Sequence, residues 1–127
     1  MGISANGRPS LSALVSLISL IFLTTAPGAF AQAFQPSQIL SNPYSYDGKR
    51  LTVSGKVWFV LPQTNRLGRD YTTFNLCNDA CIKVFTWGHL KLPEGDRKSV
   101  SGRFVTRKRV EPYNFENVLE AQEGSIR

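Results

Sequence analysis

The sequence predicts an all-β domain of five strands that close into a small barrel, after a short helical segment. The stretch Leu51–Leu61 alternates apolar residues with other residues, and this period of two is typical of a strand. Gly55 lies inside the stretch and indicates a bend or bulge, as a strand needs in order to start a barrel. Further alternating stretches follow, separated by turn-forming residues.

Residues 1–31 have the order of a secretory signal peptide: a positive Arg8, the apolar run Leu11–Leu23, and small residues before a cut after Ala31. Ala33 offers an alternative cleavage site, and an uncleaved membrane anchor is the alternative interpretation. The apolar run is short for a membrane span, which needs about 20 residues. We therefore expect an exported protein, periplasmic or extracellular, in a compartment where a disulfide can form.

The remaining chain, residues 32–127, is basic. It keeps fourteen of the fifteen basic residues, because only Arg8 precedes it, and all nine acidic residues, which leaves a net charge of +5. This balance favours anionic partners such as nucleic acid, anionic lipid headgroups or acidic polysaccharide.

Residues 32–46 form a leading segment in which Pro36–Leu40 is expected to make one or two helical turns, ended by Asn42 and Pro43. Its apolar residues are suited to plug one end of a barrel, and they are Ile39, Leu40, Tyr44 and Tyr46. The barrel itself is expected over residues 47–122, after a turn at Asp47-Gly48.

In the first strand, alternation points one set of side chains inward, namely Leu51, Val53, Val57, Phe59 and Leu61. The next two strands form a hairpin. The later strands follow after a short connection, with Gly102 at a second bend. The four downstream strands are Tyr71–Leu76, Ile82–Trp87, Lys98–Arg107 and Glu116–Ala121. Basic loops are expected at Gln63–Asp70 and Lys108–Asn114, and a frayed tail at residues 123–127.

A resemblance to a known fold rests on Asp47-Gly48-Lys49 before Leu51–Val57, and on four later segments: Tyr71–Leu76, Ile82–Phe85, Leu92–Asp96 and Val100–Phe104. Over Tyr46–Ala121 the chain resembles the OB-fold, a five-stranded Greek-key barrel, of the anticodon-binding type found in nucleic-acid-binding proteins. It is also similar to small exported bacterial OB-fold proteins. Gly88–Gly95 departs from the pattern, because it is too short for the helix that many OB-folds place there.

The resemblance implies that the first three strands are neighbours, so their outward side chains share one face. That face combines rings and cations, which suits single-stranded nucleic acid or another polyanion. Its predicted ligand-binding residues are Lys56, Trp58, Tyr71, Lys83, Phe85, Trp87 and Arg103. The flanking loops add Arg66, Arg69, Arg107, Lys108 and Arg109. Two alternatives remain. The rings pack under the chain's own ends and bind nothing, or they form a docking surface for an envelope protein. Export argues against a nucleic-acid ligand, because little nucleic acid is present outside the cytoplasm.

Cys77 and Cys81 are expected to form a disulfide across the turn of the exported hairpin. The alternative is a soft-metal or redox site that also uses His89, but a fourth ligand is not evident. No cofactor is expected. The sequence has no nucleophile, phosphate-loop or metal-ligand motif, and most of its carboxylates fall in turns. We therefore expect a binding protein and not an enzyme.

Overall fold

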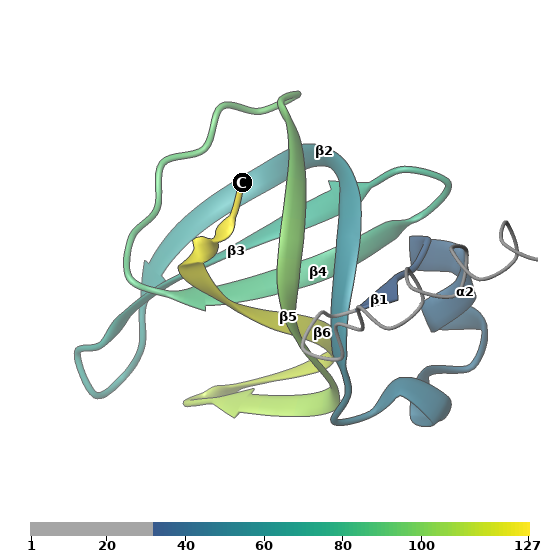
Figure 1. Cartoon of the computed structure of the whole chain (residues 1–127). Helices are drawn as coiled ribbons and strands as arrows, with labels where there is room; N and C mark the ends of the chain where they lie inside the picture. The colour runs from purple at the N-terminus through teal and green to yellow at the C-terminus, as the bar shows by residue number, and fades with distance from the viewer. Residues whose placement is uncertain (1–31) are drawn as a thin grey trace, which may run out of the picture. The chain divides into compact units, whose positions relative to one another are not determined.

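The computed structural model describes residues 32–127, so the predicted signal peptide lies outside the described residues. Most of the described chain belongs to one six-stranded sheet, which confirms the all-β prediction (Figure 1). Within residues 32–127 the helices are short, namely α2 (Pro36–Ser41) and the 3₁₀ helix η2 (Pro43–Tyr46). The strands are β1 (Gln32–Ala33), β2 (Arg50–Thr64), β3 (Asp70–Cys77), β4 (Cys81–Trp87), β5 (Arg97–Val110) and β6 (Tyr113–Ile126).

The strands pair in the order β1-β2-β3-β4-β6-β5, and β5 also pairs with β2. The long β2 makes this return possible by changing its partner. Its first half pairs with β5 from Arg50 to Lys56, and its second half pairs with β3 from Lys56 to Thr64. The short strand β1, which the sequence analysis did not predict, pairs in parallel with the start of β2. β4 and β6 are also parallel, and the remaining pairs are antiparallel.

Gly55 lies near the point where β2 changes its partner. A Cβ atom there would lie 2.6 Å from the carbonyl oxygen of Cys77 on β3, so only glycine lets the two backbones approach this closely. Gly102 on β5 allows a similar close approach, because a Cβ atom there would lie 2.2 Å from the carbonyl oxygen of Glu120 on β6. Both glycines that the sequence analysis placed at bends are therefore sites of close backbone approach.

The irregularity in β2 occurs later than predicted. The register with β3 shifts between Trp58 and Leu61, and Phe59 has a φ of 56°. Because this bulge inserts one extra residue into β2, the alternation of side chains reverses. Phe59 and Leu61 were predicted to point inward, but they are 67% and 50% exposed, while Val60 packs against the core.

The main core lies between the inward faces of β2 to β6. Its larger side chains include Leu51, Val57, Phe74, Val84 and Phe104, and α2 adds Ile39, which is fully buried. The leading segment thus covers the core as expected, although Tyr44 is exposed. The connection at residues 88–96 contains no helix, in agreement with its length.

A second apolar cluster forms on the opposite side of β3 and β4. Tyr71 and Phe85 point away from the main core but are only 1% exposed. The β5–β6 hairpin covers them with Val110 and Phe115. The prediction that these two rings present themselves to solvent is therefore wrong, because the hairpin is longer than the sequence analysis expected.

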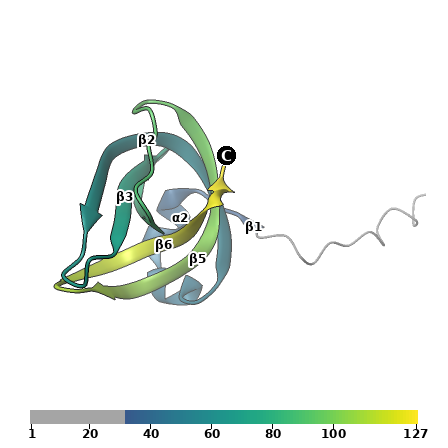
Figure 2. The same cartoon turned by 90° about the vertical axis from the view of Figure 1, so that its left-hand side faces the viewer.

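The predicted basic loop at Lys108–Asn114 is mostly strand. Lys108 and Arg109 belong to β5, and only Glu111 and Pro112 form the turn before Tyr113 begins β6. The tip of this hairpin lies beside the β2–β3 loop (Figure 2), where the Arg66 amide donates to the Glu111 carbonyl oxygen at 3.2 Å. The two segments that were predicted to be separate loops therefore touch each other.

The C-terminal end is paired and not frayed as predicted. Ile126 pairs with Val100, and the backbone of Arg127 both donates to and accepts from Ser99. At the turn of the β3–β4 hairpin, Cys77 and Cys81 form the expected disulfide. A disulfide-bonded pair fits an oxidising, exported compartment. Among residues 32–127, no helix is long and apolar enough to cross a membrane.

Candidate functional site

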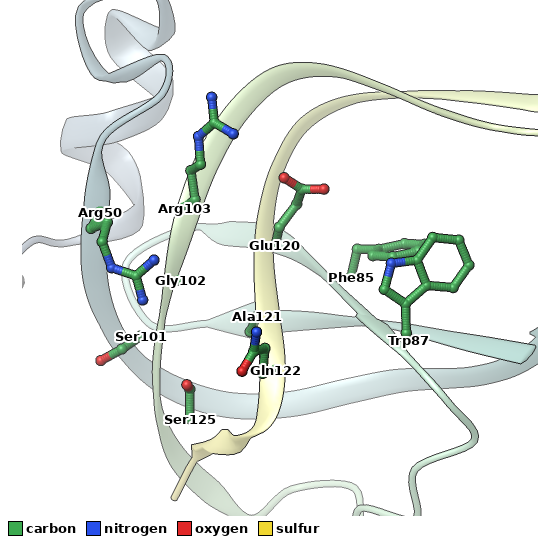
Figure 3. A pocket seen from close by; sticks show the side chains of 10 residues that line it. All are labelled: Arg50, Phe85, Trp87, Ser101, Gly102, Arg103, Glu120, Ala121, Gln122 and Ser125. Atoms are coloured by element: carbon green, nitrogen blue, oxygen red, sulfur yellow. The ribbon is translucent and has the colours of Figure 1, made fainter.

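A row of side chains crosses the outer face of the sheet. Strand register places Arg50 on β2 opposite Arg103 on β5, Arg103 opposite Glu120 on β6, and Glu120 opposite Phe85 on β4. Directly paired residues project from the same side of a sheet, so these four side chains share one face. They line a pocket of about 290 Å³ (Figure 3), which we call the arginine pocket.

The rest of the arginine pocket is lined by three uncharged polar side chains, by one aromatic ring, and by Gly102 and Ala121. Ser101 comes from β5, Gln122 and Ser125 come from β6, and Trp87 comes from β4. The hydroxyl groups of Ser101 and Thr52 form a hydrogen bond of 2.7 Å across the β2–β5 pair. The pocket therefore offers cationic forks together with hydroxyl and amide groups, which can both donate and accept hydrogen bonds.

The two arginines carry uncompensated charge. Within residues 32–127, neither Arg50 nor Arg103 forms an ion pair. The carboxylate nearest to Arg103 in the strand register is Glu120, but it forms an ion pair with Lys108. Like charges placed directly opposite each other on neighbouring strands are destabilising. A bound anion would relieve this repulsion.

Trp87 stands at the side of the pocket and is about one-third exposed. The guanidinium group of Arg69 lies 3.7 Å from the centre of its ring system, at cation–π distance. Lys108 also approaches the rings, at 5.6 Å from Trp87 and 4.7 Å from Phe85. Phe85 contacts the indole edge-on, with the ring centres 4.9 Å apart. Much of the surface of Trp87 is thus already engaged by the protein.

The structure separates the remaining residues of the predicted site. Trp58, which is partly exposed, shares an outer row with Asn75 and Lys83, through direct pairing across β2, β3 and β4. Lys56 is exposed on the same parity of β2. Tyr71 belongs to the buried second cluster, and burial raises the pKa of its hydroxyl group, with a further contribution from Tyr113.

The predicted loop cations gather around the hairpin tip. Arg66 and Arg109 both form ion pairs with Glu111. Arg107 is exposed, and it lines a second hollow of about 450 Å³ together with Lys108 and Arg109. Arg103 alone of the predicted ligand-binding cations lines the arginine pocket.

The sequence analysis missed five site residues, namely Arg50, Ser101, Glu120, Gln122 and Ser125. Arg50 has the same parity in β2 as Lys56 and Trp58, so alternation would have found it had the strand been extended by one residue. Gln122 and Ser125 were missed because the last strand was ended at Ala121, whereas β6 continues to Ile126.

The alternative metal site is not assembled. The two cysteine sulfur atoms bond to each other at the turn of the β3–β4 hairpin, and His89 follows the other end of that hairpin, where its Nε2 lies 2.9 Å from the Gln63 carbonyl oxygen. In the described part of the chain, no group of three or more His, Cys, Asp or Glu residues is placed to hold a metal ion.

A comparison of the sequence with protein-family models found no match, and a comparison with curated proteins found none either.

Proposed function

We propose that this protein is a non-enzymatic, exported binding module whose basic outer face binds an anionic polymer. In this proposal the sheet is an OB-fold barrel. The return of the pairing from β5 to β2 supports closure of the sheet, and the order of the five long strands is consistent with a Greek-key path. The disulfide supports export.

The observation that carries the proposal is the pair Arg50 and Arg103, which lie opposite each other in the β2–β5 register and both line the arginine pocket without an acidic partner in an ion pair among the described residues. Their guanidinium groups extend in different directions (Figure 3). Arginine is the side chain best suited to bind carboxylate, phosphate or sulfate groups, because its planar fork donates two parallel hydrogen bonds. A pocket lined by two arginines can therefore bind an anion through either fork.

The charge distribution of the whole domain supports the same function. Six of the nine carboxylates are engaged by the protein itself, namely Asp47, Asp70, Asp79, Glu94, Glu111 and Glu120. Only three of the fourteen cations in residues 32–127 form ion pairs, and these are Arg66, Lys108 and Arg109. Eleven cations are therefore left to attract anions from solution.

Binding of fluorescently labelled dextran sulfate, followed by anisotropy at low salt, tests this function. Arg50→Ala and Arg103→Ala are each expected to weaken binding about tenfold or more, because each removes a charge-assisted hydrogen bond. Lys91→Ala is the matched control. It removes one exposed cation from the β4–β5 connection, outside the pocket, and should weaken binding less than about twofold.

If the three variants bind equally well, or if the wild-type protein does not bind at all, the proposal fails. Circular dichroism of each variant shows whether a loss of binding comes from unfolding.

A second candidate function is docking of an envelope protein, and it is favoured by the apolar side chains that β2 and the following loop expose. Phe59, Leu61 and Leu67 are all at least half exposed. Exposed apolar side chains that gather on one surface mark interaction sites. A cross-linking experiment on envelope extracts tests this function: Phe59→Ser should lose a partner that Arg103→Ala retains.

A further inference from the structure

We infer that the anionic polymer is an acidic polysaccharide, and that the arginine pocket holds one carboxylate-bearing sugar unit. This inference rests on the proposed function and narrows it. It depends on two features of the arginine pocket and its surroundings: the neighbouring rings Tyr71, Phe85 and Trp87 are buried or already engaged, and the pocket is lined by groups that suit a sugar.

Single-stranded nucleic acid is bound largely by stacking of its bases on exposed aromatic rings. Tyr71 and Phe85 cannot serve in this way, because they are 1% exposed beneath Val110 and Phe115. Trp87 is partly exposed, but the Arg69 guanidinium lies 3.7 Å from the centre of its rings. A base that stacked on the face of the indole covered by Arg69 would have to displace this cation–π contact.

The pocket lining instead suits a polyhydroxylated ring. Ser101, Gln122 and Ser125 provide two hydroxyl groups and an amide, and each of these groups can donate and accept. Sugar hydroxyl groups have the same dual character. The planar guanidinium groups of Arg50 and Arg103 suit a carboxylate carried by the same ring.

Glu120 adds a second argument for a sugar. Glu120 lines the pocket between Arg103 and Phe85 in the strand register, and one of its two carboxylate oxygens forms the ion pair with Lys108. A carboxylate accepts hydrogen bonds from sugar hydroxyl groups.

The size of the pocket is consistent with one unit of the polymer. Its volume of about 290 Å³ lies just below the range typical of ligand pockets, which begins at about 300 Å³. Arg107, on the same strand as Arg103, is exposed farther along the outer face.

Isothermal titration calorimetry on the full exported protein at low salt tests the inference with three probes. The first is an oligogalacturonate, the second is its methyl ester, and the third is a thymidylate oligomer with the same number of charges as the first. We expect the oligogalacturonate to bind about tenfold or more tightly than the thymidylate oligomer. The methyl ester should bind at least about tenfold more weakly than the free acid, because it lacks the charge that the arginines recognise.

Two variants locate the binding site. Arg103→Ala should weaken binding of both charged probes, whereas Gln122→Ala should weaken the oligogalacturonate about three- to tenfold and leave the thymidylate oligomer unchanged. Lys91→Ala is again the control for the loss of one positive charge.

Equal or tighter binding of the thymidylate oligomer would overturn the sugar inference and leave the proposed function intact. The sugar inference would also be overturned, with the proposed function intact, if Gln122→Ala lowered the affinity for both charged probes equally or for neither of them. If no charged probe binds at low salt, both proposals fail.

Discussion

At the residue scale, two glycines determine how closely the strands of this sheet can approach. Gly55 and Gly102 both lie where a neighbouring carbonyl oxygen occupies the space that a side chain would need. Hydrophobic alternation identified both positions as bends, because a residue without a side chain interrupts the inward-facing series. Which backbone each glycine meets depends on strand pairing between distant parts of the chain.

Gly55→Ala is predicted to destabilise the protein by about 1–3 kcal/mol, because the new methyl group would overlap the backbone of Cys77. Urea unfolding followed by tryptophan fluorescence measures this loss. Gly124→Ala is the control, since a Cβ atom there meets nothing within 4 Å, and it should change the free energy of unfolding by less than about 0.5 kcal/mol. Equal stability of the two variants would contradict the close approach.

Asp79 is expected to make the stability of the fold depend on pH. The hydroxyl group of Ser37 donates to its carboxylate and is the main cause of its lowered pKa, and backbone amides add to the effect. Because the folded pKa lies below the unfolded one, the ionised carboxylate stabilises the fold above the ordinary aspartate pKa of about 3.9. This contribution is lost as the pH falls through the folded pKa.

Asp79→Asn should therefore flatten the decrease in unfolding free energy below about pH 4, as measured by urea titrations at a series of pH values. Asp96→Asn should keep the wild-type slope, because within the described residues the Asp96 side chain accepts no hydrogen bond. An unchanged slope in Asp79→Asn would show that Ser37 does not hold the carboxylate in solution.

At the element scale, the β3–β4 hairpin joins the sheet to the leading segment. Its disulfide closes the turn, and the turn residues Asn78 and Asp79 bond to Gln35 and Ser37 at the start of α2. The disulfide thus restrains the turn that anchors the helix, and Ile39 of that helix is buried in the core.

Replacing both Cys77 and Cys81 with serine is predicted to lower the free energy of unfolding by about 2 kcal/mol, a modest amount because the closed loop is very short. Guanidinium unfolding with and without reductant measures this. The double variant should be insensitive to reductant, and the wild-type protein with reductant should match it. A larger decrease in the free energy of unfolding, together with loss of the α2 helical signal, would contradict this estimate. It would mean that the disulfide stabilises the protein mainly by holding the turn against α2, and not by closing a loop.

The β5–β6 hairpin is the element that changes the interpretation of the outer face. Its extension to Val110 and Tyr113 covers the rings of β3 and β4, which the sequence presents as a platform. The sequence analysis left Phe115 outside the predicted strands. It assigned the preceding residues to a loop, because Pro112 and Asn114 are residues typical of loops. In the structure these two residues belong to a turn and to the strand after it.

At the scale of the whole molecule, most carboxylates of residues 32–127 are engaged by the protein itself, whereas most cations of these residues form no ion pair. We therefore predict that the affinity for an anionic polymer depends strongly on salt concentration. The logarithm of the affinity for dextran sulfate should fall linearly with the logarithm of the salt concentration, as counterions are released. The double variant Arg50→Ala/Arg103→Ala should make the slope shallower by about 1.4, since each cation that meets a single-stranded polyanion adds about 0.7 to it. An unchanged slope would place the binding site elsewhere.

The sequence by itself determined the β class, the approximate positions of the five long strands, the disulfide pair and the basic character of the domain. These properties depend on local alternation, on turn residues and on composition, all of which are present in neighbouring residues. It also placed Arg103, Trp58 and Trp87 on outward positions correctly.

Only the tertiary structure decided which outward side chains are exposed and which cations meet. Tyr71 and Phe85 are outward in parity but buried, because a hairpin from much later in the chain packs over them. Arg50 and Arg103 become neighbours only through the β2–β5 pairing. Alternation specifies the side of a strand on which a residue lies, whereas exposure and electrostatic partners depend on contacts between distant segments, which no local pattern encodes.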